Sequence, residues 1–460
     1  MLQADNNGKI GYNTLIVRKI LVKFVLFYLR VLAKIQLKKI DPVIIGIGGA
    51  SGKTSLSGFI YLILKEKYKV RQGFGKNSET GIPLNILGIS MEGYGILSWL
   101  KAFIAAPLKV LFDFSRFDVY IAEMGIDGPF EPKNMNYLLK IVRPQIGVLT
   151  NISLEHSEYF DPLIKDSDLE KRQKKILSLI SEQESLLVTS LKKGQTAVIN
   201  ADDAETEKIL DKIKANIVSV SLNNSKSSFF VKKIETKINS FRLNFVHKDK
   251  EFTVNIGNPL PDHYAYSFLL AIAVATKLGI SEKEAINTLE KNFSLPPGRM
   301  SIFEGIKETM IIDSSYNNAT LNPILDILEM LNKIAGKRRK VAIIGDMREV
   351  GTISEIQHEA IAKKILETCD LAILIGPQME KFVTPIFKKS NFSFYAFPNF
   401  SKAKGEILRI IQSGDLVLVK SSQNTLFLER VVEMLLKNPE DKKKLCRRGE
   451  FWDKKREQTL

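Results

Sequence analysis

The sequence predicts an α/β protein with a doubly wound, mainly parallel sheet, followed by a second, smaller α/β domain. Three observations lead to this expectation. A β-branched apolar run ends in a glycine-rich turn near residue 50, and a helical pattern follows the turn. Strand and helix patterns then alternate along most of the chain, which is typical of parallel sheets with crossover helices. Two prolines and a glycine at 296–298 interrupt this alternation, because they cannot continue a helix.

The first half of the chain contains short apolar runs bounded by polar turns, beginning with a strand that starts at Pro42. The next strands are predicted over 119–122, 146–149, 186–189 and 197–199. Helical periodicity predicts helices over 96–112, 169–180 and 264–278, and the region 216–256 predicts short, mostly antiparallel strands.

The second half repeats the alternation on a smaller scale. Strands are predicted over 310–312, 341–344, 371–375, 392–396 and 416–420. We therefore expect three parts: an N-terminal helix over 1–40, a central P-loop ATPase domain over 41–295, and a Rossmann-like C-terminal domain with a basic tail over 296–460.

Composition excludes several classes of protein. Of the 460 residues, 45% are hydrophobic and 26% are charged, as in an ordinary globular protein with ample material for buried cores. Cys369 and Cys446 are the two cysteines, so the chain has neither a disulfide framework nor a cysteine zinc site, and a reducing cytosol is the expected compartment. The net charge of +16 suits anionic partners or a solvated basic surface, but no nucleic-acid-binding motif accompanies it.

Residues 12–40 are very apolar but are interrupted by basic side chains. Their longest uncharged run within the helical part, 24–29, is far shorter than the roughly 20 residues that a spanning helix needs. The basic residues at one helical spacing share one face: Lys19, Lys23, Arg30 and Lys34. The pattern predicts a basic amphipathic helix that either docks on the protein or lies on the inner surface of the membrane, so the expected location is cytoplasmic in both cases.

The glycine-rich turn carries a phosphate-binding signature. Residues 49–54 read Gly-Ala-Ser-Gly-Lys-Thr, the shorter form of a P-loop, whereas Ile47 stands where the longer form has its first glycine. Such a loop directs backbone N–H groups and the positive end of a helix dipole at a phosphate. Lys53 is expected to reach the outer phosphates, and the Thr54 hydroxyl is expected to bind Mg²⁺. This turn predicts nucleotide binding.

Polar side chains also follow several of the expected strands. Glu123 ends an apolar strand, and a carboxylate beside a P-loop is well placed to bind Mg²⁺ directly or through water. Asn151 and His156 follow the next strand; on spacing alone, His156 is either a metal ligand or a structural residue. Asp313 and Asp346 follow strands of the C-terminal domain. These residues predict a site at the carboxyl ends of the strands without naming a reaction.

Taken in order, these segments resemble the Mur ligases, the ATP-dependent amide ligases of peptidoglycan synthesis. The resemblance covers roughly residues 41–435. It rests on short motifs in the family order: Gly49-x-x-Gly-Lys-Thr54, Asn77-x-Glu-x-Gly-x-Pro-Leu84, Glu123-Met-Gly125, Thr150-Asn-Ile152 with His156, Asn200-Ala-Asp-Asp203, Gly298-Arg299, Asp313-Ser-Ser-Tyr-Asn317, Gly345-Asp-Met347 and Asp415-Leu-Val-Leu-Val-Lys-Ser421.

The resemblance implies a ligase that uses ATP and Mg²⁺ and forms an amide bond through an acyl phosphate. The implied partners are a small-molecule muramoyl-peptide precursor of the cell wall and a dipeptide or amino acid. D-alanyl-D-alanine is the first candidate for the dipeptide. No specific nucleic acid is implied. The implied catalytic residues are Lys53, Glu123, His156 and Lys171. The implied nucleotide-binding residues are Gly49, Gly52, Lys53, Thr54, Ser55, Arg299 and Asp313. The implied substrate-binding residues are Asn77, Glu79, Asn151, Asn317, Asp346 and Lys420, and those for the metal are Thr54, Glu123 and His156.

Some features depart from the family pattern. The carbamylated lysine that bridges to Mg²⁺ in the family corresponds to Lys171 by spacing from His156, whereas the apolar pattern of the helix puts Gln173 there and Lys174 is also close. Ser314 stands where the family often carries a second acid.

The roughly forty residues before the first strand leave no room for the usual uridine-binding domain. Two alternatives to the muramoyl-peptide ligase stay open. One is an amide ligase with a different acceptor. The other, favoured by the altered Asp313 motif and the unclear bridging lysine, is a nucleotide-binding scaffold subunit that has lost ligase activity.

Overall fold

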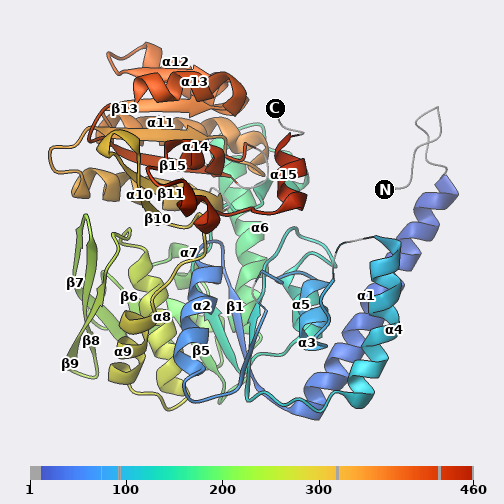
Figure 1. The fold of residues 1–460 in the computed structure, drawn as a ribbon. Coiled ribbons are helices and arrows are strands. Elements are labelled where there is room, and N and C mark those ends of the chain that lie inside the picture. Colours follow the sequence, from blue (N-terminus) through green and yellow to red (C-terminus); the bar gives the residue numbers. More distant parts are fainter. Residues whose placement is uncertain are drawn as a thin grey trace.

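Two sheets, one above the other in Figure 1, form the body of the molecule. The computed structural model describes residues 12–457 apart from residues 74, 92, 94, 318–320 and 423–425, and at 12–19 and 317 it describes the backbone only. The larger sheet has nine strands and is formed by the chain before residue 257, and the smaller sheet has six strands and is formed after residue 300. This mixed α/β architecture confirms the predicted fold class.

The larger sheet has the strand order β2-β3-β1-β4-β5-β6-β7-β8-β9. Its strands are β1 (Val43–Gly48), β2 (Val70–Gln72), β3 (Val119–Glu123), β4 (Ile146–Leu149), β5 (Thr196–Asn200), β6 (Asn216–Ser221), β7 (Phe229–Lys237), β8 (Ser240–His247) and β9 (Lys250–Ile256). Pairing is parallel from β2 to β7 and antiparallel from β7 to β9. The antiparallel pairing was expected from residue 216, where β6 begins, but it begins one strand later, between β7 and β8.

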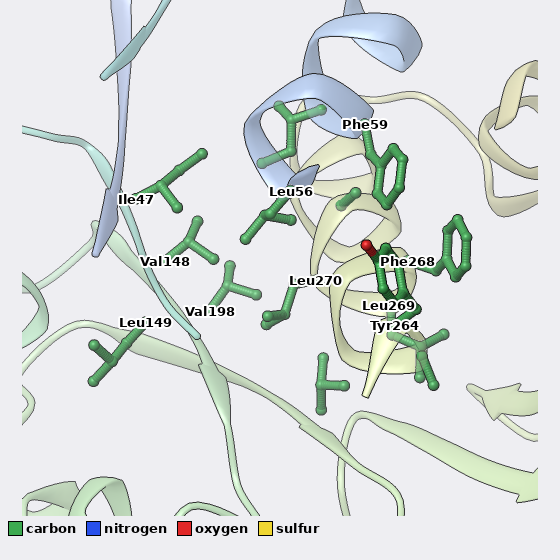
Figure 2. Close-up of a cluster of buried hydrophobic side chains, with 14 of the residues drawn as sticks. Ile47, Leu56, Phe59, Val148, Leu149, Val198, Tyr264, Phe268, Leu269 and Leu270 are labelled. Atoms are coloured by element: carbon green, nitrogen blue, oxygen red, sulfur yellow. The ribbon is translucent and has the colours of Figure 1, made fainter. Parts of the chain in front are cut away.

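Helices cover both faces of the larger sheet. They are α2 (Lys53–Leu64), α3 (Gly81–Ile86), α4 (Ile96–Phe112), α5 (Met135–Ile141), α6 (Leu169–Thr189), α7 (Ala204–Glu207), α8 (Tyr264–Lys277) and α9 (Glu282–Asn292). Figure 2 shows α2 and α8 packed together over the sheet, where Ile47, Val148 and Val198 face them. The rings of Phe59 and Phe268 stack at 4.9 Å in this layer. Because α2 begins at the P-loop, the packing of α2 in this buried layer fixes the position of the loop.

The strand expected over 186–189 is wrong, because α6 continues to Thr189. Leu187 and Val188 are fully buried, and they belong to the helix face that packs against β1 and β4. A Cβ atom added at Gly46 or Gly48 would lie 3.0 or 2.7 Å from the Leu187 side chain. The two glycines thus give the helix room to approach the sheet, and an apolar run that resembles a strand is the buried face of a helix.

The smaller sheet has the order β10-β11-β15-β12-β13-β14, with β10 antiparallel and the other pairs parallel. Its strands are β10 (Ser301–Glu304), β11 (Met310–Asn317), β12 (Lys340–Gly345), β13 (Leu371–Ile375), β14 (Phe394–Phe397) and β15 (Leu416–Ser422). Its helices are α10 (Leu321–Ile334), α11 (Ser354–Thr368), α12 (Thr384–Lys388), α13 (Phe400–Ile410), α14 (Glu429–Leu435) and α15 (Glu450–Glu457).

The N-terminal helix α1 (Tyr12–Ile40) lies against the central domain. Leu26, Leu29, Ala33 and Leu37 are buried, and α1 contacts α3, α4 and α5. The predicted docking on the protein is therefore observed for this face, whereas Val22 is 49% exposed. The side chain of Lys19 lies outside the described residues. None of the described helices is both long and apolar enough to cross a membrane.

Candidate active site

The P-loop is held in shape by close backbone packing at Gly49. This glycine has φ of 108°, and a Cβ atom added to it would lie 2.3 Å from the Thr150 hydroxyl oxygen and 2.7 Å from the Asn151 carbonyl oxygen. Only glycine fits this position without a shift of the loop. The Asn151 side chain accepts hydrogen bonds from the Ser51 N–H (3.1 Å) and hydroxyl (3.0 Å). Asn151 thus supports the loop and does not point into open space.

Lys53 begins α2 and folds back over the loop. Its ammonium group donates to the carbonyl oxygens of Gly49 and Ala50 and forms an ion pair with Glu155 at 3.0 Å. Burial lowers the pKa of Lys53, but the nearby carboxylates of Glu155 and Glu184 outweigh burial and raise the pKa above its usual value. Lys53 therefore stays charged at neutral pH, as phosphate binding requires.

Thr54 and Glu123 meet at the carboxyl end of β3. The Thr54 hydroxyl donates to one Glu123 carboxylate oxygen (Oε2) at 3.1 Å, and the other oxygen, Oε1, is buried without a hydrogen-bond partner among the described residues. Burial raises the pKa of Glu123, against the opposing effects of the Thr54 hydroxyl and the Arg299 charge. A carboxylate oxygen left over beside a P-loop hydroxyl is the donor set that Mg²⁺ prefers, so these residues fit the ion.

No cluster of three or more His, Cys, Asp or Glu side chains in the described part of the chain is arranged to hold a metal by itself. This agrees with the usual way in which Mg²⁺ binds beside phosphates, through one or two carboxylates and substrate oxygens.

His156 joins the central domain to the C-terminal domain. Its Nδ1 atom lies 2.5 Å from the Glu349 carboxylate, and its Nε2 atom lies 3.8 Å from Asp127 and 4.0 Å from Glu155. Burial lowers the pKa of His156, but the Glu349 hydrogen bond and the surrounding carboxylates outweigh it and raise the pKa above its usual value. Nδ1 is thus occupied by an orienting carboxylate while Nε2 faces the loop cavity, an arrangement common around metal-binding histidines.

A cavity of about 370 Å³ opens in front of the P-loop, between the two domains. The central domain contributes the loop residues 50–55 and Glu123, and the C-terminal side contributes Arg299 and Tyr316. Gly298 has φ of 75°, and a Cβ atom there would lie 2.7 Å from the Cβ of Tyr316, so the turn that carries Arg299 is tightly packed on β11. The arrangement brings a cation from the second domain to the cavity that holds the phosphate loop.

Glu184 on α6 is a site residue that sequence reasoning missed. It is 3% exposed, and its carboxylate accepts a hydrogen bond from the Gly49 N–H at 2.9 Å. Burial raises the pKa of Glu184 to about 7, although the Lys53 charge and the Gly49 N–H act against this. Glu184 could have been recognised from its position near the C-terminal end of α6. It was missed because a strand was expected over 186–189.

Two of the expected substrate residues lie near the cavity on the central-domain side. Asn77 lines it, and its side chain is so close to Gly125 that a Cβ atom there would lie 2.8 Å from the Asn77 amide nitrogen. Glu79 forms an ion pair with Lys133 at 3.1 Å, and Lys133 lines an adjoining hollow that also includes His156.

The expected C-terminal residues lie deeper. Asp313, Asp346 and Lys420 are at most 8% exposed, and none lines the cavity in front of the P-loop. Burial raises the pKa of Asp346 to about 6; burial, with the Arg299 charge, lowers the pKa of Lys420 to about 7. Ser314 of β11 lines the cavity instead of Asp313. The side chain of Asn317 lies outside the described residues.

The structure does not bring Lys171 to the site. Its side chain is 70% exposed and lies 3.7 Å from Asp168 at the start of α6. Lys174 is exposed as well, whereas Gln173 lines a second cavity of about 200 Å³ that includes Glu155 and His156. Helical geometry explains the difference, because successive positions of a helix point in different directions and Gln173 occupies the side of α6 that faces this cavity. The expected placement of a bridging lysine at 171 is therefore corrected.

Comparisons with known proteins agree with this geometry. Residues 47–275 match the Mur ligase middle domain, and residues 298–423 match the Mur ligase, glutamate ligase domain. Two curated relatives, both named UDP-N-acetylmuramoyl-tripeptide–D-alanyl-D-alanine ligase, come from Borreliella burgdorferi and Bacillus subtilis. They are 23% and 22% identical, over 90% and 91% of this chain and 79% and 81% of their own lengths.

Solved structures show the same fold. MurF from Acinetobacter baumannii has a TM-score of 0.71 at 18% identity, covering 88% of this chain and 79% of its own. MurF from Thermotoga maritima, solved in complex with ADP, has a TM-score of 0.68 at 22% identity, covering 90% and 84%. The two matched domains together span most of the chain and include both walls of the cavity. The chain therefore belongs to the Mur ligase family.

Proposed function

We propose that this protein is an ATP-dependent ligase that joins D-alanyl-D-alanine to a muramoyl-tripeptide precursor of the cell wall. The observation that carries the proposal is the single cavity in which the P-loop, Glu123 and Arg299 converge from two domains. The names of the curated relatives supply the substrates, and the ADP in the T. maritima structure supports the nucleotide.

The reaction proceeds through an acyl phosphate. The γ-phosphoryl group of ATP passes to the acceptor carboxylate, and the amine of the incoming dipeptide then attacks the acyl carbon and expels phosphate. The P-loop N–H groups and Lys53 bind the phosphates and stabilise the charge on the transferring oxygens. Arg299 approaches the same cavity from the second domain. Closure of the cavity between the domains keeps water from the acyl phosphate.

Thr54, Glu123 and His156 are the residues that would hold Mg²⁺. When bound, the ion neutralises charge on phosphoryl oxygens as a Lewis acid. Glu123 supplies the buried free carboxylate oxygen, and Glu349 fixes the orientation of the His156 ring.

A second candidate function is favoured by one observation. Gln173, which cannot be carbamylated, lines the cavity beside His156, while Lys171 is exposed. This supports an amide ligase with a different acceptor, or a nucleotide-binding scaffold without ligase activity.

For its location we propose a cytoplasmic protein with peripheral membrane contact through residues 12–40. The support is the basic, apolar composition of α1 and the exposure of part of its surface.

The test is ligation by the Lys53→Ala variant. Purified protein receives Mg²⁺-ATP, D-alanyl-D-alanine and a panel of muramoyl tripeptides, and phosphate release and product mass are measured. Loss of the Lys53 contact should cost several kcal/mol in the transition state and abolish product. Lys65→Ala, at the exposed end of the same helix, is the matched control and should retain activity.

Thermal unfolding of both variants shows that the fold is retained. Near-normal ligation by Lys53→Ala contradicts the assignment of the P-loop. Nucleotide binding by the wild type without product from any tripeptide supports the scaffold.

A further inference from the structure

Helices α1 and α4 form a separate layer on one edge of the central domain, which we call the α1–α4 platform (residues 20–40 and 96–114). The two helices lie side by side, away from the C-terminal sheet (Figure 1). Tyr28 stacks on Phe103 at 4.2 Å and donates a hydrogen bond to the Phe103 carbonyl oxygen at 2.9 Å. Lys39 caps the far end by donating to the carbonyl oxygens of Val110 and Asp113, both at 3.0 Å. The pair is therefore one rigid unit.

The inner side of the platform is an ordinary core. Leu29, Ala102 and Ala106 are buried in it, together with Leu84 and Leu87 from α3 and the turn after it. These contacts bury the inward faces of both helices, and in the described part of the chain the outward faces are exposed.

The outer side of the platform is unusually apolar. Large hydrophobic side chains at helical spacing form one stripe on each helix, and each is between 36% and 80% exposed. On α1 these are Ile20, Phe24, Phe27, Val31 and Ile35, with Leu21 and Val22 beside them; on α4 they are Ile96, Leu97, Leu100, Ile104, Leu108, Leu111 and Phe112, with Phe114 just beyond. So many exposed apolar side chains on two adjacent helices mark an interaction site.

The charge of the platform is strongly basic, and Asp113, just after α4, is its one acidic residue. Neither 12–40 nor 96–112 contains an aspartate or glutamate. The basic residues of these two segments are Arg18, Lys19, Lys23, Arg30, Lys34, Lys38, Lys39, Lys101 and Lys109. The rest of the chain contains both acidic and basic residues. The whole chain has 51 acidic and 67 basic residues. Much of the net charge of +16 is thus concentrated on the edge that exposes the apolar stripes.

The exposed apolar side chains and the basic charge together favour one binding partner among a second copy of the chain, a nucleic acid and a lipid bilayer. A second copy of the chain would place two strongly basic surfaces face to face, and like charges across an interface oppose association. A nucleic acid would satisfy the charge but leave the apolar stripes exposed. An anionic bilayer satisfies both, because apolar side chains enter the acyl boundary while lysines and arginines stay at the headgroups.

We propose that the α1–α4 platform docks the protein on an anionic lipid bilayer, with both helix axes in the plane of the interface. The two helices act together, so α4 contributes as much of the inserted surface as α1. The platform contributes no residue to the lining of the P-loop cavity, and its role does not depend on the ligase reaction. Failure of vesicle binding would leave the catalytic proposal intact, and loss of ligation in a vesicle-binding protein would leave the platform intact.

The first test is sedimentation of the full chain with vesicles. Wild type should bind vesicles of phosphatidylcholine mixed with phosphatidylglycerol, should release at high salt, and should bind pure phosphatidylcholine weakly. Replacing Leu100, Ile104 and Leu108 with glutamine should abolish binding. The matched control places glutamine at the exposed apolar residues Ile217 and Leu408, and this variant should bind like wild type.

The contribution of charge is tested with two variants that each lose three positive charges, one in the platform and one in the C-terminal segment. Each platform lysine contributes about a fivefold factor in partitioning, so glutamine at Lys34, Lys38 and Lys101 should weaken binding about a hundredfold. Glutamine at Lys442, Lys443 and Lys454 in the C-terminal segment is the control and should have little effect. If the C-terminal variant loses binding and the platform variant keeps it, the proposal is wrong.

The second test reports where the platform sits. The chain has two tryptophans, Trp99 on α4 and Trp452 on α15. In a Trp452→Phe variant, lipids brominated in the acyl chains should quench the remaining Trp99 fluorescence. In a Trp99→Phe variant, Trp452 should be unaffected. Quenching of Trp452 alone, or no binding by the wild type at low salt, overturns the proposal.

Two further outcomes would also overturn it. Self-association in the absence of lipid that is lost in the Leu100, Ile104, Leu108 variant would show that a second copy covers the stripes. Capture of a defined acidic protein by the wild type, without vesicle binding, would assign the platform to a protein partner.

Discussion

Glu184→Gln tests the most unusual group at the P-loop. The Glu184 carboxylate is 3% exposed and accepts the Gly49 N–H, and its burial raises its pKa to about 7. Glutamine has nearly the same shape and can accept the same hydrogen bond through its amide oxygen. The substitution therefore removes the titration and leaves the contact with the loop in place.

The sign follows from proton binding in the folded and unfolded states. Between pH 4.5 and about 7, the folded protein keeps a proton on Glu184 that the unfolded chain has released, so the free energy of unfolding falls as the pH rises. Below this window both states are protonated, and above it the full cost of the buried charge is present. Since one pKa unit corresponds to about 1.36 kcal/mol, the step from 4.5 to about 7 corresponds to about 3 kcal/mol.

The assay is urea unfolding of wild type and Glu184→Gln at a series of pH values across this window. The difference in unfolding free energy, variant minus wild type, should rise by about 3 kcal/mol as the pH increases from 4.5 to just above 7. Both proteins keep every other titrating group, so the contributions of groups that do not interact with Glu184 cancel in the difference. Glu182→Gln, at an exposed position of the same helix, controls for the loss of one carboxylate from α6. A difference that does not change with pH refutes the reasoning.

Two further predictions concern the phosphate loop and the metal. Glu123→Gln and His156→Ala should each raise the Mg²⁺ concentration needed for ligation more than they weaken metal-free ATP binding, and metal titrations that overlay wild type would contradict this. Gly49→Ala places a Cβ 2.3 Å from the Thr150 hydroxyl oxygen at φ of 108°, so it should cost about 1–3 kcal/mol in unfolding free energy and weaken ATP binding. Gly58→Ala on α2, where a Cβ meets nothing within 4 Å, should instead stabilise by up to about 1 kcal/mol, and equal thermal unfolding of the two variants would show that the loop is not constrained.

Much of the fold was predictable because parallel sheets follow simple rules. The boundaries of α4 and β4 agree with the apolar patterns that predicted them. The meeting of Thr54 with Glu123 could also be expected, since β1 and β3 are adjacent parallel strands and their carboxyl ends lie together. Such predictions depend only on local pattern and on strand adjacency.

The features that were missed depend on long-range packing. The run 186–189 has the composition of a strand, but the glycines at 46 and 48 leave space for a helix to lie on β1, and this packing carries Glu184 to the loop. Lys171 shows the same limit, because spacing along the chain does not tell which side of α6 faces the cavity. The contact between Glu184 and Gly49 joins residues 135 positions apart, and no local pattern indicates it.

The contact between His156 and Glu349 has a thermodynamic consequence. The Nδ1 atom of His156 is hydrogen-bonded to Glu349 of the C-terminal domain. Its Nε2 atom faces the P-loop cavity of the central domain. A cation bound at Nε2 would fix the tautomer with the proton on Nδ1 and so strengthen the hydrogen bond to Glu349. By reciprocity, whatever stabilises the approach of the two domains must increase the affinity of the ring for the cation by the same factor. If His156 binds the proposed ion, a single side chain couples ion occupancy to the approach of the two domains, and this cooperativity needs no further residue.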